Sequence, residues 1–297
     1  MDSSSARTFM FFLITLTLCE NVRPQSQPQN FKKITIDVNN GIITINDQFV
    51  VSNTKQMERI AGGSYANEGE FPFMAVVHRL IDGRRVSQCG GTIISKRWVL
   101  TAAHCIAKYP QRFFVIFGIV DKTGIGYDVN RGSGVSMMTS QAYVHPNYFV
   151  SKNDIGLLRM PRDIPFSENI RPIHLAGRKK SRVLADTMAC VVGWGRDGFG
   201  PKGTMRLKYT IMPLISKHEC LAYWRVDYRN ICTEPGLGKN ACQGDSGGPL
   251  FIMRNNRPLQ IGIVSYGDAN CPSGRPGVYT RVAAFAEWIR YVTGMKF

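Results

Sequence analysis

Short apolar segments recur along the chain from residue 60 onward, and clusters of glycine, proline, asparagine and aspartate separate them. The segments are rich in valine, isoleucine and aromatic residues, which favour β-strands. Representative segments are Phe73–Val77, Trp98–Leu100, Phe113–Phe117, Ile155–Leu158, Cys190–Val192 and Gln260–Ser265. This pattern is typical of antiparallel β barrels or sandwiches rather than of strands that alternate with helices.

One segment near the C-terminus has the pattern of a helix. Its apolar residues recur at spacings of three and four, so they share one helical face. They are Val282, Phe285, Trp288, Ile289 and Val292. The polar and basic stretch 161–182 is a candidate connection between two halves of the chain.

The first 59 residues differ from the rest. Residues 1–19 contain an apolar run of about eleven residues, Phe9 to Cys19, which is shorter than the ~20 residues needed to span a bilayer. We interpret 1–19 as a signal peptide, with a buried strand or helix as the alternative. No later segment is long and apolar enough to cross a membrane, so we expect a secreted, extracellular product.

Residues 20–59 form a separate region without cysteine. Two strand-like patches, Ile34–Val38 and Ile42–Ile45, flank the turn sequence Asn39-Asn40-Gly41, which predicts a hairpin. No disulfide can tie this region to the remainder of the chain.

Composition limits the classes of protein that remain. The chain has 297 residues, 44% of them apolar and 20% charged, which excludes wholesale disorder and allows one or two folded domains. The net charge is +16, and residues 1–59 contribute only +1 of it through six Lys/Arg and five Asp/Glu. A body of charge +15 favours a polyanion as a partner, or it is simply a solvated surface.

Cysteines point to an oxidising compartment. Of eight, Cys19 would leave with the signal peptide, and seven remain. We expect most of these to form disulfides, with one left over because seven is odd. A zinc site is the rival interpretation, but the sequence has no paired C-x-x-C arrangement.

Ser246 stands in the sequence Gly-Asp-Ser-Gly-Gly-Pro. Glycines beside a serine let the backbone approach another molecule closely. A nucleophilic serine also needs two backbone N–H groups directed at the oxyanion that forms on its target, and Gly244 and Ser246 could supply them. A structural serine in a glycine-rich turn is the alternative.

A nucleophilic serine requires a base and an acid that orients the base. His104 lies in Thr-Ala-Ala-His-Cys, and Asp154 lies in Asn-Asp-Ile-Gly-Leu-Leu. A charge directly before an apolar strand is a good candidate for a buried carboxylate. Each residue alone would more often be structural.

Together the three segments resemble the chymotrypsin and trypsin family of serine peptidases, and the resemblance covers residues 60–297. It implies an all-β fold of two six-stranded antiparallel β barrels, roughly 60–170 and 171–297, with a C-terminal α-helix. It implies His104 as general base, Asp154 as its orienting carboxylate and Ser246 as nucleophile. Gly244 and Ser246 would form the oxyanion hole. The substrate would be a protein or peptide, and no cofactor is required.

The resemblance extends to activation of a precursor. The sequence Arg59-Ile60-Ala-Gly-Gly resembles the site at which this family is cut, after which the new α-ammonium group inserts beside the aspartate preceding the catalytic serine. That aspartate would be Asp245. Residues 20–59 would then be a propeptide, and arginine at position 59 implies an upstream trypsin-like activating protease.

Family members also imply three disulfides and a substrate pocket. The disulfides would be Cys89–Cys105, Cys220–Cys232 and Cys242–Cys271, which leaves Cys190 as a buried thiol or, less favoured, an intermolecular bridge. The pocket would be lined by Asn240 at its base and by Ser265, Gly267 and Gly277 on its walls.

Two departures from trypsin change the expected specificity and metal content. Trypsin-like members have aspartate where this chain has the neutral Asn240, so we expect cleavage after large apolar residues. The stretch from Gly118 to Gly134 contains no glutamate, so we expect no calcium or other metal site there.

The alternative function is a polyanion-binding protein of the same fold with little catalytic role. Its docking residues for a polyanion such as glycosaminoglycan would include Arg178, Lys179, Lys180 and Arg182.

Overall fold

The computed structural model describes residues 33–37, 42–46, 63–83, 85–177, 185–197, 203–271 and 273–297. The predicted signal peptide, Arg59, Ile60 and the basic residues 178–182 lie outside the described residues. In the first two ranges, β1 (Lys33–Asp37) and β2 (Ile42–Asn46) pair antiparallel, with Ile34 opposite Ile45. This pairing confirms the hairpin that the sequence predicts.

Seven strands make up the first large sheet. They are β4 (Met74–Leu80), β5 (Val86–Ser95), β6 (Trp98–Thr101), β7 (Phe113–Phe117), β8 (Val135–Thr139), β9 (Ala142–Val144) and β10 (Gly156–Arg159). Their order is β8-β7-β4-β5-β6-β10-β9, and every pair is antiparallel. All residues of β4, β6 and β7 are buried, which is why these strands are nearly continuous apolar runs.

The second large sheet contains six strands that close into a barrel. They are β12 (Met188–Gly193), β13 (Lys208–Ile215), β14 (Asn230–Thr233), β15 (Pro249–Arg254), β16 (Arg257–Tyr266) and β17 (Val278–Arg281). The order is β16-β15-β12-β13-β14-β17, and a further pairing of β16 with β17 completes the ring. Two short strands, β3 (Ser64–Tyr65) and β11 (His174–Leu175), add to β13 and β16.

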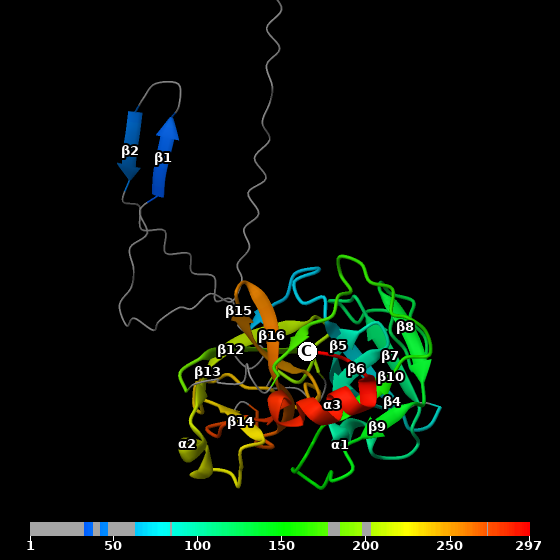
Figure 1. Ribbon diagram of the computed structural model, residues 1–297. Coiled ribbons are helices and arrows are strands. Elements are labelled where there is room, and N and C mark those ends of the chain that lie inside the picture. Colours follow the sequence, from blue (N-terminus) through cyan, green and yellow to red (C-terminus); the bar gives the residue numbers. More distant parts are fainter. Residues whose placement is uncertain are drawn as a thin grey trace, which may run out of the picture.

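The predicted all-β, trypsin-like fold is confirmed, and the two sheets differ in how far they close. The second forms the expected six-stranded barrel. Within the described residues, the first is a half-barrel, because no ladder joins its outer strands β8 and β9. The two sets of strands lie side by side in Figure 1, and the chain passes from the first to the second between β10 and β11.

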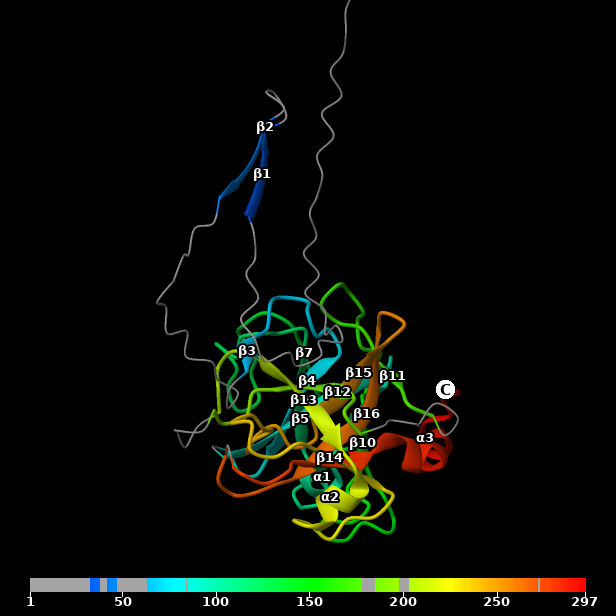
Figure 2. The ribbon, with the colours of Figure 1, turned by 90° about the vertical axis from the view of Figure 1, so that its left-hand side faces the viewer.

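The C-terminal helix forms where its apolar spacing predicts, but it begins with a tighter turn. A 3₁₀ turn, η2 (Val282–Phe285), leads into α3 (Ala286–Thr293). Val282, Phe285 and Ile289 are buried and join the core of the first sheet. The helix thus starts from the second barrel, and the rings of Phe285 and Trp288 contact His145, which follows β9 of the first sheet, at 5.2 Å each. Figure 2 shows α3 at one side of the molecule, next to the C-terminus.

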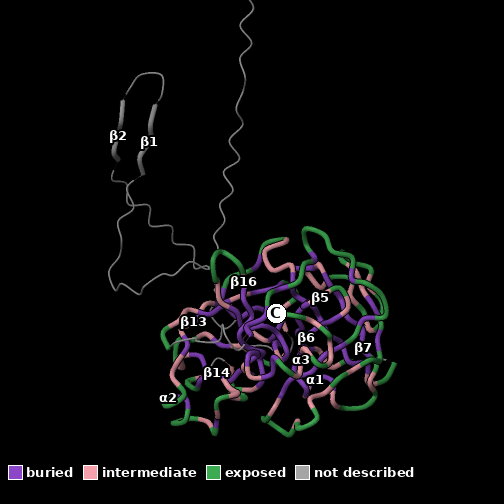
Figure 3. The backbone as a smooth tube through the Cα atoms, viewed as in Figure 1, coloured by how far each residue is buried: buried purple, intermediate pink, exposed green. Residues whose placement is uncertain are grey.

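Buried residues fill both sheets, and exposed residues gather on the connecting loops (Figure 3). One apolar cluster extends from the first sheet into the second barrel through Phe73 and Phe251, whose rings contact each other edge to face at 5.3 Å. The shared core explains why the loops at the junction can hold a fixed geometry. None of the helices in the described ranges is long and apolar enough to cross a membrane.

Candidate active site

Strand register brings His104 and Asp154 together. His104 lies in α1 (Ala103–Ile106), directly after β6, and Asp154 lies two residues before β10. In the antiparallel pair of β6 and β10, Gly156 lies opposite Thr101. The chain leaving β6 and the chain entering β10 therefore meet at the same edge of the sheet.

His104 and Asp154 make two hydrogen bonds. The ring Nδ1 of His104 lies 2.8 Å from Asp154 Oδ2, and the His104 backbone N–H donates to Oδ1 at 2.9 Å. The aspartate is 3% exposed, whereas the histidine side chain is 33% exposed. The carboxylate thus fixes one ring nitrogen from inside the protein and leaves the other side of the ring open to a reactant.

The second barrel also holds Asp154. Ser265 Oγ donates to Asp154 Oδ2 at 2.6 Å, and Thr280 Oγ1 donates to the Asp154 carbonyl at 2.8 Å. Burial raises the pKa of Asp154, but the hydrogen bonds from His104 and Ser265 outweigh it and lower the pKa below its ordinary value. Asp154 is therefore ionised at neutral pH.

Ser246 lies in a turn that glycines allow to pack against the His104 segment. The Ser246 carbonyl accepts from the Gly90 N–H at 2.8 Å, and Cys105 Sγ lies 3.6 Å from it. Gly247 has φ +82°, and a Cβ there would lie 2.2 Å from Thr101 Oγ1. Gly244 has φ +100°. Only glycine fits at position 247, where the backbone approaches this closely. The turn therefore places Ser246 beside Cys105, the residue that follows His104.

Asp245 is buried directly beneath this turn and is 2% exposed. Its Oδ1 accepts from the Gly195 N–H at 2.6 Å and its Oδ2 from the Cys242 N–H at 2.9 Å. Burial raises its pKa to about 6, although the two backbone donors and the charge of Lys122 act in the opposite direction. Asp245 is thus a buried carboxyl group that lacks a close cation among the described residues.

Lys122 is the basic residue whose charge lowers the pKa of Asp245. Its Nζ donates to Gln88 Oε1 at 2.8 Å, and Gln88 Nε2 donates to the Trp194 carbonyl at 3.5 Å. Burial lowers the pKa of Lys122 to about 8, and the charge of Asp245 partly offsets this. Sequence reasoning missed this pair, because Lys122 is far from Asp245 along the chain and belongs to no motif.

A cavity of about 220 Å³ opens beside Ser246. Its lining includes Asn240, Ser265, Gly267 and Gly277, all of which the sequence placed in the substrate pocket. A Cβ on Gly267 would lie 3.9 Å from the Gly277 Cα, and a Cβ on Gly277 would lie 2.5 Å from Asn240 Oδ1. Side chains at either glycine would therefore narrow the cavity.

Both the oxygen and the nitrogen of the Asn240 side-chain amide form hydrogen bonds within the protein. Its Oδ1 accepts from the Ala241 N–H at 2.8 Å, and its Nδ2 donates to the Arg275 carbonyl at 3.2 Å. Asp268 is the one charged residue in the described lining, and its carboxylate lies 3.5 Å from Arg275 Nε. The base of the cavity is therefore neutral.

All three expected disulfides are present: Cys89–Cys105, Cys220–Cys232 and Cys242–Cys271. Cys190 is buried on β12 and forms no disulfide with another cysteine of the described ranges. The Cys89 and Cys105 sulfur atoms and a ring nitrogen of His104 lie within 4.8 Å of one another. Because the two sulfur atoms are bonded to each other, they offer no thiolate to a metal ion.

The all-β fold, the contact of His104 with Asp154 and the cavity lined by Ser246 are typical of serine peptidases. A family model described as Trypsin matches residues 60–289. The chain belongs to the trypsin family and is a serine-type endopeptidase.

Curated relatives and one solved structure agree with this assignment. Serine protease SP24D of Anopheles gambiae is 32% identical over 79% of this chain and 81% of its own length. CLIP domain-containing serine protease B4 of Anopheles gambiae is 32% identical over 78% of this chain and 70% of its own. Coagulation factor XI of Bos taurus is 32% identical over 80% of this chain but only 38% of its own length. The HL collagenase structure has a TM-score of 0.69 and 29% identity, covering 79% of this chain and 99% of that one.

Proposed function

We propose that His104, Asp154 and Ser246 are a catalytic triad that cleaves peptide bonds through an acyl-enzyme. The observation that carries this proposal is the buried Asp154 carboxylate, which contacts His104 Nδ1 at 2.8 Å beside a cavity lined by Ser246. A buried aspartate with this contact holds the imidazole in the tautomer whose other nitrogen can accept a proton.

In the reaction, Ser246 Oγ attacks the carbonyl carbon of the scissile bond, and its proton passes to His104 Nε2. The N–H groups of Gly244 and Ser246 stabilise the negative charge that develops on the carbonyl oxygen. The protonated His104 gives its proton to the departing amine, which leaves an ester on Ser246. Water, deprotonated by the same imidazole, then hydrolyses the ester and regenerates the serine.

Replacement of the nucleophile tests the triad. Ser246→Ala should lower kcat by several powers of ten and leave only the contribution of binding and the oxyanion hole. The measurement is hydrolysis of a peptide library by purified, cleaved protein, with the exposed Ser140→Ala variant as the control. Turnover by Ser246→Ala at the rate of the control would contradict the assignment.

We infer that cleavage after Arg59 activates the precursor by creating an α-ammonium group on Ile60. Asp245 supports this inference, because a buried carboxyl group with its pKa raised to about 6 gains much from a cation. The ammonium group would keep Asp245 ionised and thereby hold the turn that contains Gly244 and Ser246 in its working shape.

A non-cleavable precursor tests the activation step. Arg59→Gln should stay nearly inactive after treatment with a trypsin-like protease, while the wild-type chain gains activity together with a new N-terminus at Ile60. Arg23→Gln, which alters another arginine before residue 60, should activate as the wild type does. Equal activity of cut and uncut wild-type protein would exclude activation by cleavage.

We propose that the enzyme prefers large apolar side chains before the scissile bond. The neutral amide of Asn240, which is hydrogen-bonded at both ends, offers a substrate lysine or arginine no countercharge, and a buried cation without its partner costs about 3–5 kcal/mol. An aromatic side chain buries roughly 150–250 Å² instead, worth about 4–6 kcal/mol before ordering costs. Gly267 and Gly277 leave room for such a group.

We propose that the enzyme acts outside the cell after removal of residues 1–19. Three disulfides within one peptidase body support this, because disulfides persist in oxidising compartments.

A specific cavity favours binding of a polyanion as a second, accessory function. A cavity of about 470 Å³ is lined by His174, Arg254 and Arg257 with three uncharged residues, and its described lining contains no acidic residue. Sulfate groups of a glycosaminoglycan fit this chemistry. Arg254→Gln with Arg257→Gln should elute from heparin at lower salt than wild type, whereas exposed Arg162→Gln should not. Equal elution of all three proteins would exclude this site.

A further inference from the structure

The chain directly before Asp154 adopts backbone conformations that need support. Ser151 and Asn153 have φ of +65° and +51°, and left-handed backbone is costly for residues other than glycine. Asn153 immediately precedes Asp154, so any relaxation here would shift the carboxylate that contacts His104.

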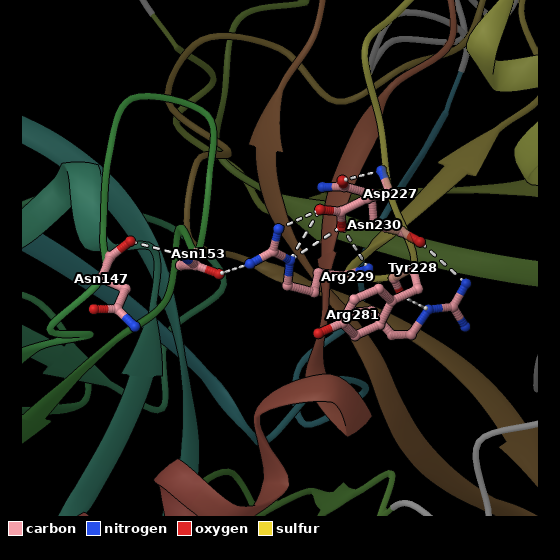
Figure 4. A network of polar contacts seen from close by, with 7 residues as sticks. All are labelled: Asn147, Asn153, Asp227, Tyr228, Arg229, Asn230 and Arg281. Carbon is pink, nitrogen blue, oxygen red and sulfur yellow. Dashed lines mark hydrogen bonds and ion pairs between the residues drawn. The ribbon is translucent and has the colours of Figure 1, made fainter.

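Both ends of the Asn153 side chain are clamped. Its Oδ1 accepts from Arg229 Nη1 at 2.8 Å, and its Nδ2 donates to the Asn147 carbonyl at 2.6 Å. Figure 4 shows Asn153 between Asn147 on one side and the Arg229 guanidinium on the other. Asn147 belongs to the same loop, whereas Arg229 comes from the second barrel, just before β14.

Arg229 is itself held by several hydrogen bonds. Its Nε lies 3.1 and 3.0 Å from the two carboxylate oxygens of Asp227, and its Nη2 also donates to that carboxylate. The carbonyls of Tyr228 and Asn230 accept from Arg281 of β17 at 3.0 Å each. Residues of the second barrel thus orient the Arg229 guanidinium. Because its N–H donors have a fixed planar geometry, this group is suited to holding another side chain in position.

We propose that Arg229 is a positioning residue for catalysis, which acts through Asn153 to hold Asp154 against His104 across the junction of the two sheets. The inference rests on the proposed triad. The guanidinium of Arg229 is paired with the Asp227 carboxylate, so the effect of Arg229 on Asp154 is geometric rather than electrostatic. A misplacement on the order of 1 Å in an active site costs up to about a hundredfold in rate.

The first test compares two arginines of one cavity. Arg225 and Arg229 both line a cavity of about 250 Å³, and Arg225 is exposed there. Arg229→Met should lower kcat about ten- to a hundredfold with little change in KM, and Arg225→Met should lower neither. Arg229→Lys, which keeps an N–H donor for Asn153, should recover much of the lost kcat.

Two further readouts separate positioning from loss of structure. The low-field proton resonance of the His104 Nδ1–H should weaken in Arg229→Met at a temperature well below unfolding, since its bond to Asp154 becomes less well formed. The combined effect of Arg229→Met and Asn153→Ala should be smaller than the product of the two single effects, because both variants remove the hydrogen bond between Arg229 and Asn153.

Three outcomes would overturn the proposal: an unchanged kcat in a folded Arg229→Met, fully multiplicative effects with Asn153→Ala, or an unchanged His104 resonance. If Arg229→Met does not fold, the same predictions apply to Asn153→Ala alone. Failure of the triad itself would show differently, as normal turnover in Ser246→Ala.

Discussion

At the scale of single residues, Asp154 connects both halves of the molecule. Its carboxylate contacts His104 of the first sheet and Ser265 of the second, and its carbonyl accepts from Thr280. The residue proposed to orient the base is therefore also the residue that contacts both sheets.

Neutralising this carboxylate should be costly. Asp154→Asn should lower kcat by about 10⁴, because an amide favours the wrong tautomer of His104 while leaving the geometry intact. The lowered pKa of Asp154 means that the wild-type group stays ionised as pH falls, so its stabilising contacts are lost only below its ordinary titration range. Steady-state rates between pH 5 and 9 measure the effect; a loss smaller than tenfold throughout would contradict this role.

The proposed specificity depends on Asn240. Asn240→Asp should raise kcat/KM for peptides with lysine or arginine before the scissile bond and lower it for phenylalanine, because a buried carboxylate gains a countercharge only from a basic substrate. Peptides that differ only at this position give the measurement. A wild-type preference for arginine over every apolar residue would refute the expected specificity.

The residues of the candidate site were predictable from sequence where chemistry imposes a motif. Serine, histidine and aspartate need defined neighbours, so their segments can be found without a fold. Ser265 was expected only as a wall of the pocket, and its bond to Asp154 depends on the three-dimensional approach of β16. Thr280, Lys122 and Arg229 act across long separations in sequence, and none stands in a recognisable motif.

At the scale of elements, the contact between the two sheets depends on aromatic residues. Phe251 on β15 is 2% exposed, and its ring contacts those of Phe71 and Phe73 at 5.9 and 5.3 Å. This cluster joins the entry to the first sheet with the wall of the second barrel.

Removal of the Phe251 ring should lower the stability of the whole fold. Phe251→Ala should lower the free energy of unfolding by about 3–5 kcal/mol, through lost transfer energy and an unfilled cavity. Phe166→Ala, at a ring that is 40% exposed, should change it by only about 0.5 kcal/mol. Urea unfolding of both variants gives the comparison, and equal losses would show that the cluster does not stabilise the fold.

Apolar periodicity predicted most strands and the C-terminal helix, since burial on one or both faces leaves a local pattern. It could not predict the tighter first turn at Val282–Phe285 or the open edges of the first sheet. Both depend on which strands meet, which is decided by contacts far apart along the chain.

At the scale of the whole molecule, the proposed activation through Asp245 would also change the stability of the fold. In the uncut chain its pKa is raised to about 6 from an ordinary 3.8. The folded state then binds its proton more tightly than the unfolded state does, so its contribution to stability falls as pH rises from about 4 to 6. The two-unit shift corresponds to about 3 kcal/mol.

The uncut protein should therefore lose stability over that range relative to Asp245→Asn, while exposed Asp128→Asn should track the wild type. Cleavage after Arg59 should remove the loss, because an ammonium group beside Asp245 lowers its pKa. Urea unfolding at pH 4, 5, 6 and 7 measures the difference. Identical pH profiles for cut and uncut protein would contradict the link.

We propose that cutting after Arg59 makes Ser246 nucleophilic. Mass spectrometry of fluorophosphonate-treated protein tests it most directly, since this reagent phosphonylates only an activated serine. One adduct, on Ser246, is expected in the cut chain and nearly none in the uncut chain. Equal labelling of both forms, or an adduct on another residue, would contradict it.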